Sequence, residues 1–231
     1  DVMEAGRERV KEQFKIQVTA DNHEVINRSD IVILSVKPQF YAEVIAEIKD
    51  DVREDQIIIT IAPGKTLAWL KEQFGKNVKI VRTMPNTPAL VGAGMTAACP
   101  NEYMTKEEIA YVLTLLESFG RVEIIPERLM DTVVSVSGSS PAYVFMFIEA
   151  MADAAVSGGM PRAQAYQFAA QAVLGSAKMV LETGKHPGEL KDMVCSPAGT
   201  TIEAVRVLEE KGFRSSVIEA MKTCEEISKS M

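Results

Sequence analysis

The chain has 231 residues, of which 47% are apolar and 25% are charged, and its formal net charge is −7 at pH 7. This balance is typical of a water-soluble globular protein with room for two domains. Lys and Arg are spread along the sequence, which argues against a nucleic-acid partner or an anionic membrane surface. Because no uninterrupted apolar run approaches the roughly 20 residues of a membrane span, and the first 15 residues are charged throughout, we expect a cytoplasmic protein. Three scattered cysteines predict neither a disulfide framework nor a metal site.

The first half of the chain alternates strand and helix patterns. Short apolar runs that end at Pro or Gly predict strands buried on both faces, and longer stretches with helical spacing predict the helices between them. In chain order we expect a helix over Glu4–Phe14, a strand over Asp30–Val36, a helix over Gln39–Lys49, a strand over Gln56–Ala62, a helix over Thr66–Phe74, strands over Val78–Arg82 and Gly94–Ala98, a helix over Lys106–Phe119 and a strand over Val122–Ile125. This alternation predicts an α/β fold with an open, mostly parallel, Rossmann-like sheet over residues 1–126.

The pattern changes after Pro126, because Ala, Met, Leu and Glu then dominate and strand signals disappear. Residues 127–231 are therefore predicted to form a separate, all-helical domain. Its expected helices are Arg128–Val136, Pro141–Ser157, Pro161–Glu182, His186–Met193, Thr200–Lys211 and Arg214–Ser230. Small residues are dense in Pro161–Glu182, which favours an extensive helix–helix interface within or between subunits.

A dinucleotide-binding sheet normally opens with a strand, a glycine-rich turn and a helix, and the sequence lacks this opening unit: before Gly64 its one glycine is Gly6. We expect that about 30 residues, roughly the length of such a unit, are missing ahead of Asp1. Asp1 itself is a candidate for the acidic group that holds a cofactor ribose, although a helix-capping role explains it equally well.

Three loops follow predicted strands: Ser35–Pro38, Ile61–Gly64 and Met84–Ala89. Because ligands of open α/β sheets bind outside the carboxyl ends of the strands, these loops should face one crevice. Asn86 and Thr87 can offer hydrogen bonds to a carboxamide, and Lys37 can lie near a phosphate or ribose. Each loop alone is explained as an ordinary connection between a strand and a helix. Three such loops at the ends of strands together favour a cofactor site.

The second half contains one informative turn, Ser196-Pro-Ala-Gly199, which leads into a helix that opens with Thr200 and Thr201. The free N–H groups and positive dipole end of such a helix form a ready site for a carboxylate. The commoner interpretation is an ordinary capping box, with Thr200 as N-cap and Glu203 three residues later. His23, in an expected polar loop, and His186 are interpreted as surface residues, and Cys195 as a packing residue.

Four motifs together resemble the pyrroline-5-carboxylate reductases over essentially the whole chain. They are Asp30–Pro38, Arg82–Pro88, Val136–Tyr143 and Leu190–Thr201. The resemblance implies a Rossmann-like domain, a helical domain that dimerises, with rings of dimers in some members, and reduction of the C=N bond of 1-pyrroline-5-carboxylate to L-proline, the last step of proline biosynthesis. It implies NADPH as cofactor, with NADH as the alternative.

The resemblance also assigns site residues. Cofactor contacts map onto Asn22, Ser35, Val36, Lys37, Pro38, Ala62, Asn86 and Thr87. The substrate turn maps onto Ser196, Gly199, Thr200 and Thr201, and the Thr201 hydroxyl is implied as hydrogen-bond partner of the ring nitrogen, which makes it the candidate catalytic residue.

Two positions depart from the family pattern: Pro63 replaces the usual alanine, and Ala198 replaces a glycine. We expect a tolerable backbone angle at Ala198, since a positive φ would strain an alanine by roughly 1 kcal/mol or more. Two alternatives stay open: another two-domain NAD(P)-dependent dehydrogenase, and a non-catalytic dimerisation protein that has lost nucleotide binding.

Overall fold

A computed structural model describes residues 1–230, and the chain divides into two compact units. The first unit comprises Asp1–Gly138 together with the residues from Glu225 onward, and the second comprises Ser139–Cys224. The boundary after residue 126 expected from the sequence stays a prediction. In the spatial division, twelve further residues belong to the first unit, where Met130 packs with Met84, Ala97 and Cys99.

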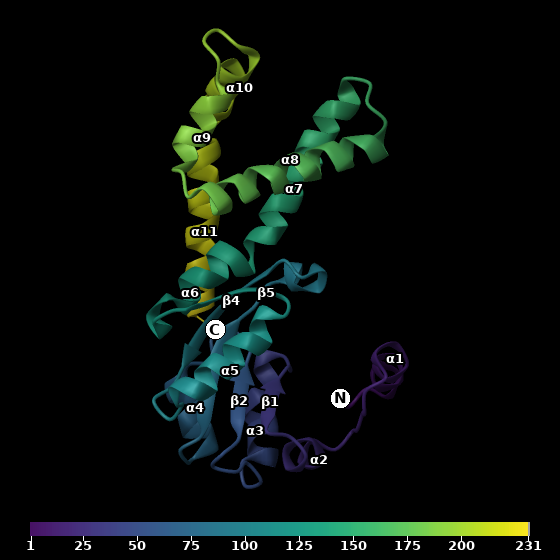
Figure 1. Cartoon of the computed structure of the whole chain (residues 1–231), viewed down its shortest axis with the longest axis vertical. Helices are drawn as coiled ribbons and strands as arrows, with labels where there is room; N and C mark the ends of the chain where they lie inside the picture. The colour runs from purple at the N-terminus through teal and green to yellow at the C-terminus, as the bar shows by residue number, and fades with distance from the viewer. Residues whose placement is uncertain (231) are drawn as a thin grey trace. The chain divides into compact units, whose positions relative to one another are not determined.

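A five-stranded sheet forms the centre of the first unit (Figure 1). Its strands lie in chain order: β1 (Ile31–Leu34), β2 (Ile57–Thr60), β3 (Lys79–Met84), β4 (Gly94–Pro100) and β5 (Gly120–Ile124). Neighbouring strands are parallel except for β3 and β4, which are antiparallel. The mostly parallel sheet expected from the sequence is therefore confirmed.

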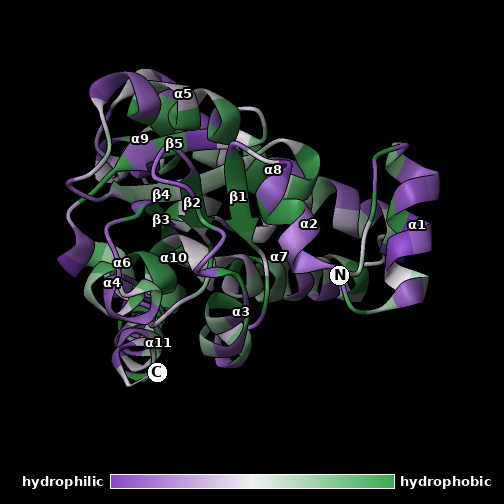
Figure 2. Ribbon diagram, turned by 90° about the horizontal axis from the view of Figure 1, so that it is seen from below, coloured by the Kyte–Doolittle hydropathy of each residue, from purple (hydrophilic) through white to green (hydrophobic). Residues whose placement is uncertain are grey.

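Helices cover both faces of this sheet, which explains why the strands are apolar on both sides. On one face, Val32, Ile58 and Ile80 pack with buried residues of α2 (Asn22–Asn27), α3 (Tyr41–Ile48) and α4 (Leu67–Phe74). On the other face, Ile57, Ile59 and Val81 pack against α5 (Lys106–Glu117). The hydrophobic colouring of β1 and β2 in Figure 2 follows this double burial.

The N-terminal segment contains one helix that was predicted and one that was not. The charged helix α1 (Glu4–Phe14) has the predicted bounds and buries none of its residues. The short helix α2 begins after Asp21, whose carboxylate accepts a hydrogen bond from the His23 backbone N–H at 2.9 Å. The expectation that His23 lies in a polar loop was thus wrong, because an Asp cap can start a helix in a polar stretch with little apolar periodicity.

The helix predicted over Arg128–Val136 is divided in the structure into three short pieces. A 3-10 turn, η3 (Glu127–Leu129), precedes α6 (Met130–Val133), and a π-helical turn, η4 (Val134–Gly138), follows. The Ser137 hydroxyl donates to the Val133 carbonyl at 3.3 Å, a side-chain bond of the kind that competes with regular helix geometry. Two other 3-10 turns follow strands, η1 (Pro38–Phe40) and η2 (Thr87–Val91).

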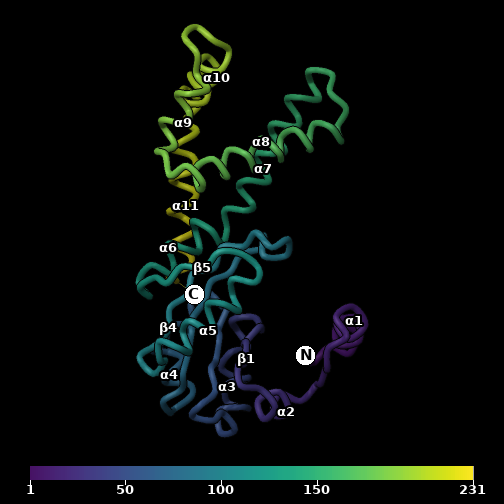
Figure 3. The backbone as a smooth tube through the Cα atoms, viewed as in Figure 1, coloured from purple at the N-terminus to yellow at the C-terminus, as the bar shows by residue number. Residues whose placement is uncertain are grey.

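The second unit is helical, as predicted. It contains α7 (Ser140–Ser157), α8 (Arg162–Thr183), α9 (Pro187–Val194), α10 (Thr200–Glu210) and most of α11 (Phe213–Lys229). The chain turns back between α7 and α8 at Gly158–Pro161, as the tube in Figure 3 shows. This helical hairpin is tied near its turn by an ion pair between Arg162 and Asp153 at 2.5 Å.

Candidate active site

Three loops of the first unit meet at one edge of the sheet, because β1, β2 and β3 are parallel and end on the same side. The loop after β1 exposes Ser35, Val36 and Lys37 and leads through the half-buried Pro38 into η1. In the loop after β2, Ala62 is buried in the core, so only its backbone can face a ligand. The three loops that the sequence predicted to face one crevice therefore lie at the same edge of the sheet.

A cavity of about 680 Å³ adjoins the end of β3. Its volume lies in the range of small-molecule sites, and most of its lining side chains are apolar. Polar groups come from Asn86, Thr87 and Thr83. The lining residues are Ile33, Ile59, Ile61, Thr83, Pro85, Asn86, Thr87, Ala89, Leu90, Leu116, Phe119 and Gly138.

The side chain of Asn86 has a structural task that the sequence did not reveal. Its Oδ1 accepts from the Met95 backbone N–H at 2.8 Å, and its Nδ2 donates to the Ser137 carbonyl at 3.0 Å. These bonds connect the loop after β3 to β4 and to the π-helical turn. Asn86 therefore fixes the cavity wall, and the exposed Thr87 beside it has the freer polar group.

Asn22, the remaining predicted cofactor contact, lies apart from these loops. Its Nδ2 donates to Oε2 of Glu47 at 2.8 Å. Glu47 belongs to the last turn of α3, whereas Lys37 lies just ahead of that helix, so the eight residues of α3 separate them by about 12 Å. The structure does not bring Asn22 to the three loops, and its role as a cofactor contact stays a prediction.

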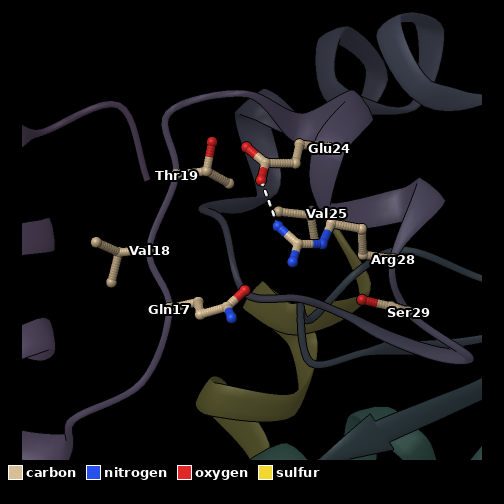
Figure 4. Close-up of a pocket in the computed structure, with 7 residues that line it drawn as sticks. All are labelled: Gln17, Val18, Thr19, Glu24, Val25, Arg28 and Ser29. Carbon is tan, nitrogen blue, oxygen red and sulfur yellow. Dashed lines mark hydrogen bonds and ion pairs between the residues drawn. The ribbon is translucent and has the colours of Figure 1, made fainter.

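A second cavity of the first unit, about 330 Å³, lies beside α2 (Figure 4). It is lined by Gln17, Val18, Thr19, Glu24, Val25, Arg28 and Ser29. Arg28 donates to Glu24 at 2.7 Å, and hydrogen bonds from Thr19 and Arg28 lower the pKa of the Glu24 carboxyl. Because the two charges neutralise each other, this cavity offers no free charge to a phosphate.

Side-chain ligand atoms of Asp21, His23 and Glu47 lie within 4.8 Å of one another, a grouping the sequence did not suggest. All three residues are exposed, and His23 Nδ1 is bonded to Asp51. That bond, with the nearby carboxylates, raises the pKa of His23. Asp21 accepts from the His23 backbone N–H and Glu47 accepts from Asn22, so each member of the group has its own partner, as in an ordinary surface network.

In the second unit, the turn before α10 is closed by a hydrogen bond from the Gly199 N–H to the Ser196 carbonyl at 3.0 Å. Ala198 has a φ of 55°. The expectation of an unstrained angle there was therefore wrong: Ala198 occupies the third position of a type II turn, whose left-handed geometry usually belongs to glycine. A Cβ on Gly199 would overlap with Ser196 Oγ, so a larger residue at position 199 would require the Ser196 side chain to rotate away.

The first turn of α10 has no side-chain cap. Its N-cap is Gly199, and the Glu203 carboxylate accepts from Arg206 Nε at 3.0 Å instead of returning to the helix start. The capping box that the sequence favoured is therefore absent. By helix geometry, the backbone N–H groups of Thr200, Thr201 and Ile202 have no partner within the helix.

The tip of α10 is therefore suited to an anion. The unpaired N–H groups and the positive end of the helix dipole both attract negative charge. Ser196 and Thr200 are exposed and Thr201 is half-buried, so hydroxyl groups flank the tip. The backbone N–H of Ile202 was missed from the sequence, because every residue except proline has such a group and the residue type does not show which ones are free.

Residues 127–231 match the family model described as pyrroline-5-carboxylate reductase dimerisation, and residues 2–64 match that described as NADP oxidoreductase coenzyme F420-dependent. The pyrroline-5-carboxylate reductase of Escherichia coli is 60% identical over 220 residues, which cover 95% of this chain and 82% of that protein. The chain belongs to the pyrroline-5-carboxylate reductase family.

Solved structures of the family agree with this assignment. The enzyme from Coxiella burnetii superposes with a TM-score of 0.91 at 33% identity, covering 100% of this chain and 86% of that one. The Plasmodium falciparum enzyme, solved with NADP bound, has a TM-score of 0.86 at 34% identity, covering 92% and 80%. The reductase family and enzyme class expected from the sequence, an NAD(P)H-dependent oxidoreductase, are confirmed, and the alternative of a dehydrogenase from another family is excluded.

The dimerisation match also bears on an apolar helical stretch. Glu127–Ser157 is long and apolar enough to cross a membrane by length and composition, although it contains no uninterrupted apolar run of that length. Most of its residues are not buried in the single chain, and the stretch lies inside the reductase dimerisation region. A helix surface that pairs with a second subunit needs the same apolar composition.

Proposed function

We propose that this reductase converts 1-pyrroline-5-carboxylate to L-proline, with the substrate carboxylate held at the tip of α10. The observation that supports this most is the uncapped helix start after Gly199. An anion there would pair with the free N–H groups of Thr200, Thr201 and Ile202 without any arginine. The Gly199 N–H is engaged with Ser196, so the role of Gly199 is to shape the turn.

The carboxylate contact would orient the substrate ring over the first turn of α10. Reduction adds a hydride to the imine carbon and a proton to the nitrogen, which leaves a secondary amine. Thr201 stands in the first helical turn, one residue beyond Thr200, and its hydroxyl would donate a hydrogen bond to the ring nitrogen. Such a bond fixes the nitrogen and strengthens as hydride addition moves electron density onto it, which favours protonation of the nitrogen to the amine.

The loops at the sheet edge are the proposed holders of the nicotinamide cofactor, which supplies the hydride when bound. The apolar cavity beside Asn86 and Thr87 has the size and lining for a planar ring. Thr87 would bind the carboxamide, Asn86 would keep the wall in place, and Ser35, Val36, Lys37, Pro38 and the Ala62 backbone would line the path of the remaining cofactor. We propose NADPH as the main donor.

The residues that the structure describes fit one end of the cofactor better than the other. Among residues 1–230, no glycine-rich turn between a strand and a helix is present for the pyrophosphate. The three loops would therefore hold the nicotinamide end and the path beside it, and none of the described residues is assigned to the pyrophosphate.

The assembly and location follow from the same proposal. The helical region is a dimerisation domain, and we propose a homodimer in the cytoplasm, with a ring of dimers as a further assembly. A small, charged substrate and a soluble cofactor suit an aqueous compartment.

The direct test is to assay the protein produced from its complete reading frame. NADPH oxidation should depend on 1-pyrroline-5-carboxylate and should yield L-proline in equal amount, which chromatography can quantify. Absence of substrate-dependent oxidation with both NADPH and NADH would refute the proposed activity and favour a dimerisation protein without catalysis.

A further inference from the structure

Gly138 ends the π-helical turn η4 and lines the apolar cavity beside β3. Glycine is expected where the chain needs a positive φ or where another atom lies too close for a side chain. Neither reason applies to Gly138. Its φ lies outside the positive range, and a Cβ there would meet its nearest atoms beyond the adjoining residues only at 3.9 Å, namely Met84 Sδ, the Val133 carbonyl oxygen and Val134 Cγ1. The free protein would therefore accept alanine at this position.

Two other glycines of the first unit show the requirement that is missing at Gly138. A Cβ on Gly94 would lie 2.9 Å from the Phe119 carbonyl oxygen, and a Cβ on Gly120 would lie 2.1 Å from the Gly94 carbonyl oxygen. Those distances exclude any side chain, because β4 and β5 pair closely where Gly94 meets Gly120. At Gly138 packing imposes no such limit, and helical geometry favours alanine over glycine. The open space at this residue is thus not explained by the fold itself.

The turn that carries Gly138 is held in place by side-chain hydrogen bonds. Asn86 Nδ2 donates to the Ser137 carbonyl at 3.0 Å, and the Ser135 hydroxyl donates to the Thr132 carbonyl at 2.8 Å. Ser135 is buried. Turns of this π-helical kind are rare and frequently lie at functional sites. Because the turn is anchored, a methyl group added at residue 138 would stay beside the cavity instead of being absorbed by a movement of the backbone.

We propose that Gly138 is a cofactor-binding residue, and that its missing side chain leaves the room in which the nicotinamide ring lies against the backbone of η4. Glycine is the residue that lets a backbone approach a ligand closely. Apolar lining residues such as Ile59 and Leu116 suit the faces of a planar ring. The depth of the ring in the cavity would also set the point from which the hydride leaves. The inference rests on the proposed function of this cavity as the nicotinamide site.

The test is Gly138→Ala in the protein produced from its complete reading frame. The methyl group would fill part of the space for the ring, so Kd for NADPH should rise about 5- to 100-fold, the range expected for one extra methyl group in a filled site. The probe 2′-phospho-ADP-ribose has the rest of the cofactor but no nicotinamide, and its Kd should stay within twofold. Fluorescence titration measures the first affinity and calorimetric titration the second.

Stability provides a readout of opposite sign. Alanine makes only ordinary contacts in the free protein, so the urea midpoint of Gly138→Ala should be unchanged or raised. Val136→Ile is the matched control, because it adds one methyl group to the same turn at a side chain that is 51% exposed and does not line the cavity. It should leave both affinities unchanged. A joint loss of stability and of NADPH binding in Gly138→Ala would mark a structural glycine and overturn the inference.

The remaining outcomes separate this inference from the proposed function. Unchanged NADPH binding in Gly138→Ala overturns the inference, as does an equal loss of affinity for NADPH and for 2′-phospho-ADP-ribose. A raised KM for 1-pyrroline-5-carboxylate with unchanged Kd for NADPH would give the space to the substrate instead, and also overturns it. A wild-type protein that binds NADPH but does not oxidise it with 1-pyrroline-5-carboxylate refutes the proposed function, while the comparison of the two cofactor probes still decides the role of Gly138. Failure of the wild type to bind NADPH overturns both.

Discussion

Around the α10 tip, some of the proposed substrate contacts come from backbone amides and others from side chains. The free amides belong to Thr200, Thr201 and Ile202, whereas the turn that presents them depends on Gly199 and Ala198. A backbone anion site is insensitive to most side-chain changes, so the hydroxyl of Thr201 is the group whose removal should report on chemistry.

Thr201→Ala should lower kcat by at least 10-fold and up to about 10⁴-fold, because a hydrogen bond to the reacting nitrogen strengthens as charge develops there. Kd for NADPH should change little, since Thr201 is not among the proposed cofactor contacts. Steady-state kinetics with the imine varied, together with cofactor titration, measures both.

Thr201→Ser keeps a hydroxyl and should recover most of the rate. Thr114→Ala removes a hydroxyl of α5 that donates to the Ala110 carbonyl at 3.0 Å and should leave kcat unchanged. Wild-type kcat in Thr201→Ala would remove this residue from the mechanism.

At the scale of elements, one carboxylate connects three parts of the first unit. Glu127 of η3 accepts from Arg82 Nη1 of β3 at 2.9 Å and from the Leu67 N–H of α4 at 2.7 Å. The Arg82 residue is 3% exposed. Its guanidinium has no other charged partner within 4 Å in residues 1–230.

Glu127→Ala should therefore destabilise the protein by about 2–4 kcal/mol, because it leaves a buried guanidinium unpaired and an amide of α4 without its acceptor. Urea unfolding at pH 7 measures the change. Glu123→Ala, an exposed carboxylate on β5, is the control and should shift the free energy by less than about 0.5 kcal/mol. Equal effects of the two variants would show that the Arg82 pair contributes nothing.

The helix α5 is joined to β3 by a titratable pair. Glu108 completes the capping box of Thr105 and accepts from Lys79 Nζ at 2.5 Å. The hydrogen bond from Lys79, and then that from the Thr105 N–H, lower the pKa of Glu108 below its ordinary value of 4.5. A lowered folded-state pKa means that this stabilisation is present above about pH 4.5 and is lost as the pH falls through the folded-state value.

Glu108→Gln keeps the capping geometry but removes the charge, and it should cost up to about 1 kcal/mol at pH 7. The difference from wild type should shrink between pH 5 and pH 3, as both side chains become neutral. Denaturant unfolding across this range gives the test, and a difference that does not vary with pH would contradict the assignment.

At the scale of the whole molecule, the second unit leaves an apolar groove unfilled. A cavity of about 460 Å³ between α7 and α8 is lined by Phe147, Met151, Ala172, Val173, Ser176, Ala177 and Val180. One turn before Ala172, Phe168 is 68% exposed in the single chain. An apolar surface of this kind in a dimerisation domain is the natural contact for a second subunit.

Ala172→Glu should weaken the dimer by at least tenfold in Kd, because it places an unpaired carboxylate in a surface that loses water on assembly. Analytical ultracentrifugation over a range of protein concentrations reports the change. Gln13→Glu adds the same charge on the exposed helix α1 and should leave the dimer intact. Wild-type association in Ala172→Glu would move the interface elsewhere.

What could be predicted from the sequence was mainly local and periodic. The apolar runs of β1, β2 and β3 and the helical spacing of α3, α4 and α5 identified the Rossmann-like sheet, because burial on both faces imposes those patterns directly on residue type. Four motifs in order sufficed for the family, since a run of motifs constrains a chain more than any single loop does.

The tertiary structure decided what depends on contacts between distant residues. It broke the helix after Arg128 at the π-helical turn, bound the amide of Asn86 to Met95 and Ser137, and placed Asn22 beside Glu47. It also paired Glu203 with Arg206, which left α10 uncapped, and set Ala198 in the left-handed region. Residue type limits which bonds and backbone angles are open to each residue, but the surrounding fold selects among them.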